Sequence, residues 1–124
     1  MMDFNGETLI KLRKVDDKKA FDQLTPLFVS GETIVGVYKG VRDYVAFTNK
    51  RIISVNSQGV TGKKKDVTCL PYAKVQAFSI DTSCHFEIDS ELQVWFSGLG
   101  QIRFEFTGGS DIMLIGKIIS EHIL

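Results

Sequence analysis

The chain has 124 residues, of which 44% are hydrophobic, and its fifteen basic residues balance fifteen acidic ones. This length and apolar content fit one globular domain with its own core, whereas the zero net charge disfavours binding to nucleic acid. No apolar run approaches the roughly 18 residues of a membrane span, and the N-terminus lacks the apolar core of a secretory signal. We therefore expect a single cytoplasmic domain over residues 1–124.

The first segment, residues 1–30, is predicted to be a short helical segment. Asp16 or Asp17 is suited to cap a helix that ends near Pro26. The apolar residues Leu9, Ile10 and Leu12 are spaced closely enough for a partly buried helix or an arm.

Between residues 31 and 107 the pattern changes to strands separated by polar turns. A short turn at Thr48–Lys50 joins two apolar runs, which makes those runs antiparallel neighbours. The sequence predicts an antiparallel β-barrel of about seven strands. These strands are expected over residues 32–39, 43–47, 51–55, 66–70, 75–81, 86–96 and 102–106.

The clearest alternation in this region extends from Phe86 to Phe96. Its even-numbered positions are mainly apolar and its odd-numbered positions mainly polar, so one face of the strand is predicted to be buried and the other wet. The stretch fits either one long bent strand or two collinear strands that flank Ser90.

The last segment, residues 110–124, is predicted to be a helix. Ser110 is a favourable N-cap and Asp111 suits the positive end of the helix. A wide apolar stripe follows from Ile112 to Ile123. The expected fold class is mainly β (α+β), with helical structure at the two ends of the chain.

Three blocks of sequence resemble the bacterial pleckstrin-homology domain family: RDYVAFTNKRIISV, then GVTGKKKDVTCLPYAKVQAFSID, then FEIDSELQVWFSG. The resemblance covers the chain from Gly31 onward. It implies two near-orthogonal antiparallel sheets capped by a C-terminal helix, with no established catalytic machinery and no cofactor. It also implies scaffolding or interaction domains that form homo-oligomers. Headgroup binding by eukaryotic pleckstrin-homology domains does not transfer with the fold.

Concentrated positive charge occurs only in the loop that contains Lys63, Lys64 and Lys65, with Lys50 and Arg51 expected nearby. Such a patch is a candidate site for phosphate or anionic lipid, although a few cations recruit only weakly, at about 1 kcal/mol each. The alternative interpretation is ordinary solvated charge. A phosphate-binding P-loop is excluded because position 57 is serine and position 64 is lysine.

The carboxylates Glu87, Asp89 and Glu91 are predicted to share the wet face of one strand. A calcium site would require further oxygen ligands from a dedicated loop, so no metal is expected. A neighbouring subunit with a basic strip is a better partner for this acidic face. Cys84 and His85 are adjacent on a strand and point to opposite faces, so they do not form a nucleophile–base pair. An enzyme is therefore not expected.

Several predicted strands carry apolar residues on both faces, as at Ile52 with Ile53 and at Leu70 with Cys69. Trp95 lies on the otherwise polar face of its strand, where it suits an interface anchor. Two covers are possible for this apolar surplus: another subunit, or the segment from Leu9 to Leu27 of the same chain.

Two functions are consistent with this sequence. The first is a non-catalytic interaction or scaffold module that self-associates through strand edges and apolar faces, and that also accepts another protein as partner. The second is a peripheral membrane module that weakly binds anionic lipid or phosphate through Lys63–Lys65. Nucleic acid is not an expected partner of either.

Overall fold

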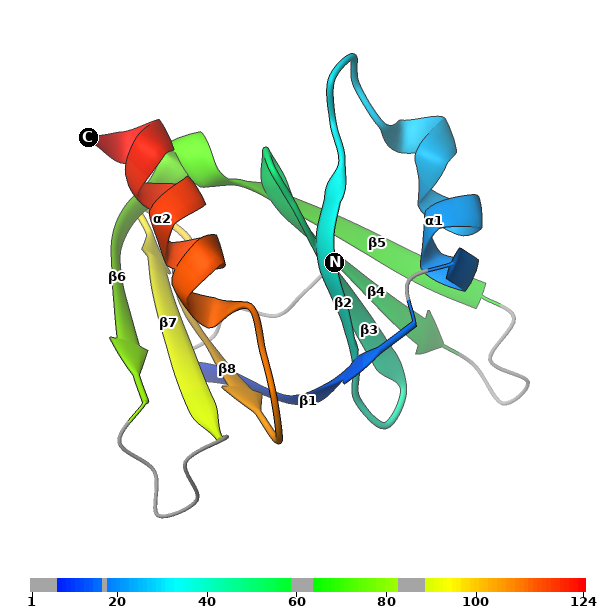
Figure 1. The fold of residues 1–124 in the computed structure, drawn as a ribbon, viewed down its shortest axis with the longest axis horizontal. Helices are drawn as coiled ribbons and strands as arrows, with labels where there is room; N and C mark the ends of the chain where they lie inside the picture. Colours follow the sequence, from blue (N-terminus) through cyan, green and yellow to red (C-terminus); the bar gives the residue numbers. More distant parts are fainter. Residues whose placement is uncertain (1–6, 17, 59–63, 83–88) are drawn as a thin grey trace.

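The computed structural model describes residues 7–16, 18–58, 64–82 and 89–124. Figure 1 shows a strongly curled β-sheet with one helix at each side. The elements are β1 (Glu7–Val15), α1 (Lys18–Leu24), the 3-10 turn η1 (Thr25–Leu27), β2 (Ile34–Lys39), β3 (Asp43–Thr48), β4 (Arg51–Gln58), β5 (Lys64–Pro71), the 3-10 turn η2 (Tyr72–Lys74), β6 (Val75–Asp81), β7 (Ser90–Phe96), β8 (Gly100–Phe106) and α2 (Ile112–Ile123).

All eight described strands form one sheet in the order β5-β4-β3-β2-β1-β8-β7-β6. The expectation of about seven strands in two separate antiparallel sheets is therefore corrected. The sheet is mixed, because β1 pairs antiparallel with β2 and parallel with β8. The strong curl makes a half-barrel from this single sheet, with the β2–β5 part and the β6–β8 part facing each other across the core (Figure 1).

The strand β1 replaces part of the helical segment predicted for residues 1–30. Ile10 and Leu12 are 8% and 2% exposed, whereas Lys11 and Arg13 between and after them are exposed. This is the period-two pattern of a strand, and the apolar Leu9 beside Ile10 masked it by suggesting a helical cluster. Among the described residues of this region, α1 and the 3-10 turn η1 are helical. The first backbone N–H of α1, that of Lys18, donates to Asp16 Oδ1 (3.1 Å).

The main core lies on the inner face of the sheet, where residues of the strands pack against α2. The inward positions of β7 are buried and its outward positions Glu91, Gln93 and Trp95 are half-buried, which confirms the predicted alternation over Ser90–Phe96. The earlier part of that stretch, residues 86–88, lies outside the described residues. Ile102, Phe104 and Phe106 of β8 are buried in the same way.

The C-terminal helix forms where it was predicted, and it is closely seated on the sheet. A Cβ atom at Gly116 would lie 2.6 Å from Ile80 Cδ1 of β6. Asp111 is the N-cap residue, but its side chain does not cap the helix. The carboxylate instead accepts a hydrogen bond from the Tyr38 hydroxyl (2.8 Å) and forms an ion pair with Lys14 (2.9 Å). These contacts connect the beginning of α2 to β1 and β2.

A second, smaller core lies on the outer face of the β2–β4 part of the sheet. Ala20 and Leu24 of α1 pack there on buried side chains of three strands, namely Val37, Ala46, Ile53 and Val55. The apolar surplus of these strands is thus covered within the chain by the segment that contains α1. Ile52 and Leu70 are 0% and 3% exposed on the inner face, so their predicted place in an exposed interface is corrected.

Candidate functional site

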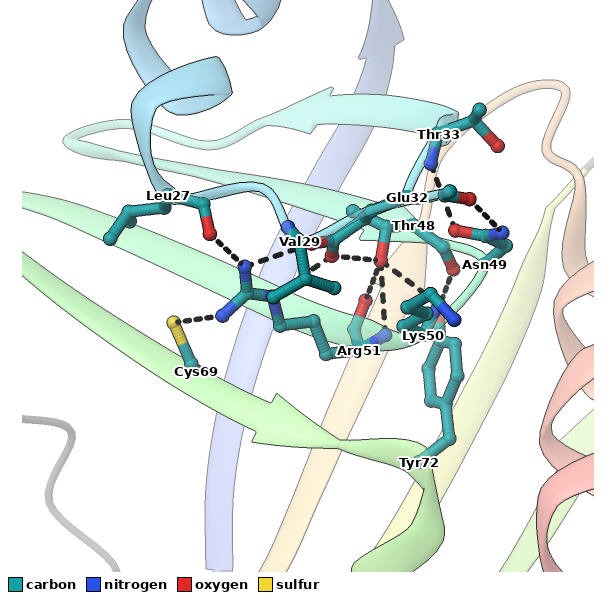
Figure 2. Close-up of polar contacts among 11 residues, drawn as sticks. Leu27, Val29, Glu32, Thr33, Thr48, Asn49, Lys50, Arg51, Cys69 and Tyr72 are labelled. Carbon is teal, nitrogen blue, oxygen red and sulfur yellow. Dashed lines mark hydrogen bonds and ion pairs between the residues drawn. The ribbon is translucent and has the colours of Figure 1, made fainter.

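Arg51, expected to belong to an anion-binding patch, lies in a closed cluster of polar contacts (Figure 2). Its guanidinium forms a two-pronged ion pair with Glu32, with Nε–Oε2 and Nη2–Oε1 distances of 2.9 Å. The Nη2 group also donates to the Leu27 carbonyl (2.7 Å), and Nη1 donates to Cys69 Sγ (3.5 Å). Arg51 is therefore occupied within the protein and is not a free anion ligand.

Thr48 organises the predicted turn Thr48–Lys50 beside this ion pair. Its Oγ1 donates to Glu32 Oε2 (2.7 Å) and accepts the backbone N–H groups of Lys50 and Arg51 (3.0 Å each). The Thr48 carbonyl accepts the hydroxyl of Tyr72 from η2 (2.7 Å). The cluster joins the β3–β4 turn, the segment before β2 and the β5–β6 corner, as Figure 2 shows. Its role is structural.

The electrostatics of Glu32 fit this structural role. Burial by itself raises the pKa of a carboxyl group. Here hydrogen bonds from Arg51, Thr48 and the Val29 backbone, together with the charge of Arg51, outweigh that effect and hold the pKa of Glu32 below its ordinary value. The carboxylate is thus ionised and paired, with a side chain that is 0% exposed.

The lysines of the predicted basic patch do not converge. Lys50 is exposed at the β3–β4 turn, whereas Lys64 and Lys65 are exposed at the other end of the β4–β5 pair, opposite Gln58 and Ser57. Six residue steps of a strand separate these ends, roughly 20 Å. Lys63 lies outside the described residues. The structure therefore separates Lys50 from Lys64 and Lys65.

The predicted acidic face is partly neutralised inside the chain. Glu91 Oε1 lies 3.5 Å from Arg103 Nε, and Glu105 Oε1 lies 3.8 Å from Arg103 Nη2. Asp89 Oδ1 accepts the backbone N–H of Gly108 (2.9 Å), and Glu87 lies outside the described residues. The basic strip expected on a neighbouring subunit is thus supplied, for Glu91, by the adjacent strand. Trp95 lies half-buried on this same outer face of the sheet.

A basic groove that sequence reasoning missed lies between α1 and the β2–β3 turn. Its cations come from separate elements: Arg13 of β1, Lys19 of α1, Lys39 of β2 and Lys65 of β5, with Arg42 at the turn. The groove has a volume of about 640 Å³. Val15, Ala20, Val37 and Tyr44 contribute apolar surface, and Asp16, Gln23, Val41, Asp43 and Ser57 complete the lining. We call this set of residues the basic groove.

Sequence reasoning missed the basic groove because its cations are isolated along the chain and only the fold brings them together. Arg13 and Lys39 lie directly opposite each other in the β1–β2 register. The one available signal was the exposed half of the β1 alternation, Lys11 and Arg13, which became visible only once this segment was recognised as a strand. Among the predicted site residues that the structure describes, Lys65 is the one that belongs to the groove.

Within residues 7–16, 18–58, 64–82 and 89–124, no three His, Cys, Asp or Glu side chains gather in a way that would hold a metal ion. None of the helices in this part of the chain is both long enough and apolar enough to span a membrane.

Comparisons with known proteins agree with the curled sheet and C-terminal helix. The profile of the family described as bacterial PH domain matches residues 3–123. A solved protein with a pleckstrin-homology domain from Shewanella loihica is 32% identical, with a TM-score of 0.73 over 96% of this chain and 100% of its own. A solved pleckstrin-homology domain from Shewanella amazonensis is 37% identical, with a TM-score of 0.60 over 89% of this chain and 90% of its own.

A curated relative shows the same level of similarity. The uncharacterized protein YjqA of Bacillus subtilis is 37% identical over 101 residues, which are 80% of this chain and 81% of YjqA. A mainly β half-barrel with one C-terminal helix is the architecture of a pleckstrin-homology-like domain. The chain belongs to the bacterial PH domain family.

Proposed function

We propose that this protein is a cytoplasmic, non-catalytic interaction module that self-associates through the edges of its sheet. One observation carries the proposal: among the described strands, β5 pairs only with β4 and β6 pairs only with β7. A strand that pairs on one side offers backbone N–H and C=O groups to another chain.

The side chains on these two strands favour such pairing. Proteins commonly protect an edge with charged residues or proline. In β5 these residues stand at the two ends, as Lys64, Lys65 and Asp66 before the middle of the strand and Pro71 after it. The middle of β5 carries no charge and exposes Val67 (42%). In β6 the one charged residue is Asp81, at the end of the strand.

The mass of the protein in solution tests this proposal. We expect light scattering after gel filtration to give a multiple of the 13.9 kDa chain mass. Val67→Lys places a charge in the middle of the β5 edge and is expected to shift the mass toward a single chain, because a lysine on an edge opposes strand addition. Ala77→Lys tests the β6 edge in the same way.

A matched control is available in the β7–β8 turn. Leu99 is 42% exposed, as Val67 is, and Leu99→Lys adds the same charge away from both edges. This variant should keep the mass of the unmodified protein. A single-chain mass for the unmodified protein across the micromolar range would contradict the proposal. An equal loss of association in the edge variants and in the Leu99→Lys control would contradict it as well.

The second candidate function is weak binding of phosphate or anionic lipid by Lys63–Lys65. It is favoured by one observation, the position of Lys65 in the basic groove beside cations of three other elements. The candidate therefore moves from the loop alone to the groove.

A further inference from the structure

Arg13 and Lys39 of the basic groove form an unfavourable pair unless an anion lies between them. They stand opposite each other on antiparallel strands, where Cβ atoms are about 5 Å apart and like charges repel. Within the part of the chain that the structure describes, neither side chain forms an ion pair with a carboxylate. The adjacent Lys14, on the other face of β1, has Asp111 at 2.9 Å.

Two more cations reach the same groove from other elements. Lys19 comes from α1, whose position is held by the hydrogen bond from the Tyr44 hydroxyl to Gln23 Oε1 (2.7 Å). Lys65 of β5 donates to Ser57 Oγ (3.2 Å), which also lines the groove. Four cations on four elements therefore surround a concave surface with apolar side chains in it, where electrostatic attraction is stronger than on an open surface.

Neither of the two carboxylates that line the groove, Asp16 and Asp43, forms an ion pair with these four cations. Asp16 accepts the backbone N–H at the beginning of α1. Burial raises the pKa of Asp43, and the adjacent positive charge of Arg42 opposes that rise. Arg13, Lys19, Lys39 and Lys65 thus remain available to a ligand.

We propose that the basic groove binds a compact anion with two or more phosphate groups, either free or as the headgroup of a lipid. Arg13 offers a planar fork that matches phosphate oxygens in a bidentate manner, and the three lysines act as point charges around it. A single carboxylate or chloride ion would leave most of these cations unpaired. A volume of about 640 Å³ lies within the usual range for small-ligand sites. Of the four cations, only Lys65 also lies on the β5 edge proposed for self-association, and Val67 and Ala77, the positions changed to test that proposal, do not line the groove.

Calorimetric titration with inorganic pyrophosphate is the first test. We expect saturable binding to the unmodified protein that weakens as salt rises. The double variant Arg13→Ala/Lys39→Ala should lower the affinity about tenfold or more, since two charge-assisted contacts are lost. The control Lys74→Ala/Lys117→Ala removes two exposed lysines outside the groove and should leave the affinity within about twofold.

Further measurements distinguish a free phosphate ligand from a lipid headgroup. Binding to pyrophosphate alone identifies a free ligand, whereas flotation only with vesicles that contain the diphosphate lipid cardiolipin, and not with neutral phosphatidylcholine, identifies a headgroup. Citrate carries a comparable charge on carboxylates and should bind less tightly. Absence of binding to both phosphate probes at about 1 mM, equal affinity for citrate, or equal losses in the two double variants would overturn the proposal.

Discussion

The surroundings of each charged residue decide whether its charge is paired inside the protein or exposed to a ligand. The sequence suggested the same role for Arg51 and Lys65, because Lys65 belongs to the basic loop and Arg51 was expected near it. Arg51 is paired with the buried Glu32, whereas Lys65 is exposed in the basic groove. The difference comes from a carboxylate 19 positions away along the chain, which no local pattern around Arg51 indicates.

Glu32→Gln should destabilise the protein by about 3 kcal/mol at pH 7, because it leaves the Arg51 guanidinium without its counter-ion in a largely buried place. The pKa of Glu32 is below its ordinary value in the folded state. The stability from this group is therefore present above the unfolded-state pKa and is lost as the pH falls through the folded-state pKa. The difference in free energy of unfolding between the unmodified protein and the variant should therefore decrease as the pH decreases from 7 to about 3.

Urea unfolding across this pH range measures both effects. Glu121→Gln, on the exposed side of α2, makes the same chemical change without a buried partner and should alter stability by less than about 0.5 kcal/mol. If the difference in free energy of unfolding between the unmodified protein and Glu32→Gln stays constant with pH, the Glu32 charge does not stabilise the fold.

At the scale of elements, α1 gives the β2–β4 part of the sheet two buried faces. The strands there carry apolar residues on the inner and the outer side, as at Ile52 and Ile53, and both of these are 0% exposed. The inner side faces the main core and the outer side faces Ala20 and Leu24. A short helix of seven residues is marginal alone, so its formation depends on this packing.

Leu24→Ala should therefore lower stability by about 3 kcal/mol, since it removes a side chain that is 2% exposed in the second core. Leu27→Ala is the matched control, because Leu27 follows α1 directly and is 46% exposed. That variant should cost less than about 1 kcal/mol. Thermal unfolding followed by circular dichroism gives both values. Equal losses would mean that α1 does not cover the outer face in solution.

At the scale of the whole molecule, β1 joins the two parts of the sheet. Its first residues pair in parallel with β8, and its last three pair with β2. The main core receives side chains from both parts, including Phe47 of β3 and Phe104 of β8, whose rings are 5.5 Å apart. A single shared strand and a single shared core favour one cooperative unfolding transition.

We expect Trp95 fluorescence, which reports on the β6–β8 part, and far-UV circular dichroism, which reports on the whole sheet, to give the same urea midpoint. Leu12→Ala in β1 should lower both midpoints together, because Leu12 is 2% exposed. Leu9→Ala in the same strand, where Leu9 is 42% exposed, should leave them nearly unchanged. Two separate midpoints in any of these proteins would show that the parts unfold independently.

The sequence by itself determined the elements whose signal is local. The alternation in β7 and β8, the turn at Thr48–Lys50 and the apolar stripe of α2 each depend on neighbours within a few residues. These were predicted, as was the bacterial PH family. The strand β1 had a local signal too, in the alternation of Ile10 and Leu12 with lysine and arginine, but the adjacent Leu9 obscured it.

Only the tertiary structure decided what depends on residues far apart in the chain. The parallel pairing of β1 with β8 joins residues from the two ends of the sequence. The cover that α1 gives the outer face, the partner of Arg51 and the opposition of Arg13 to Lys39 all arise in the same way. The physical reason is that the periodicity of apolar residues indicates which face of an element is buried, whereas the element that covers this face is determined by the packing of the whole core.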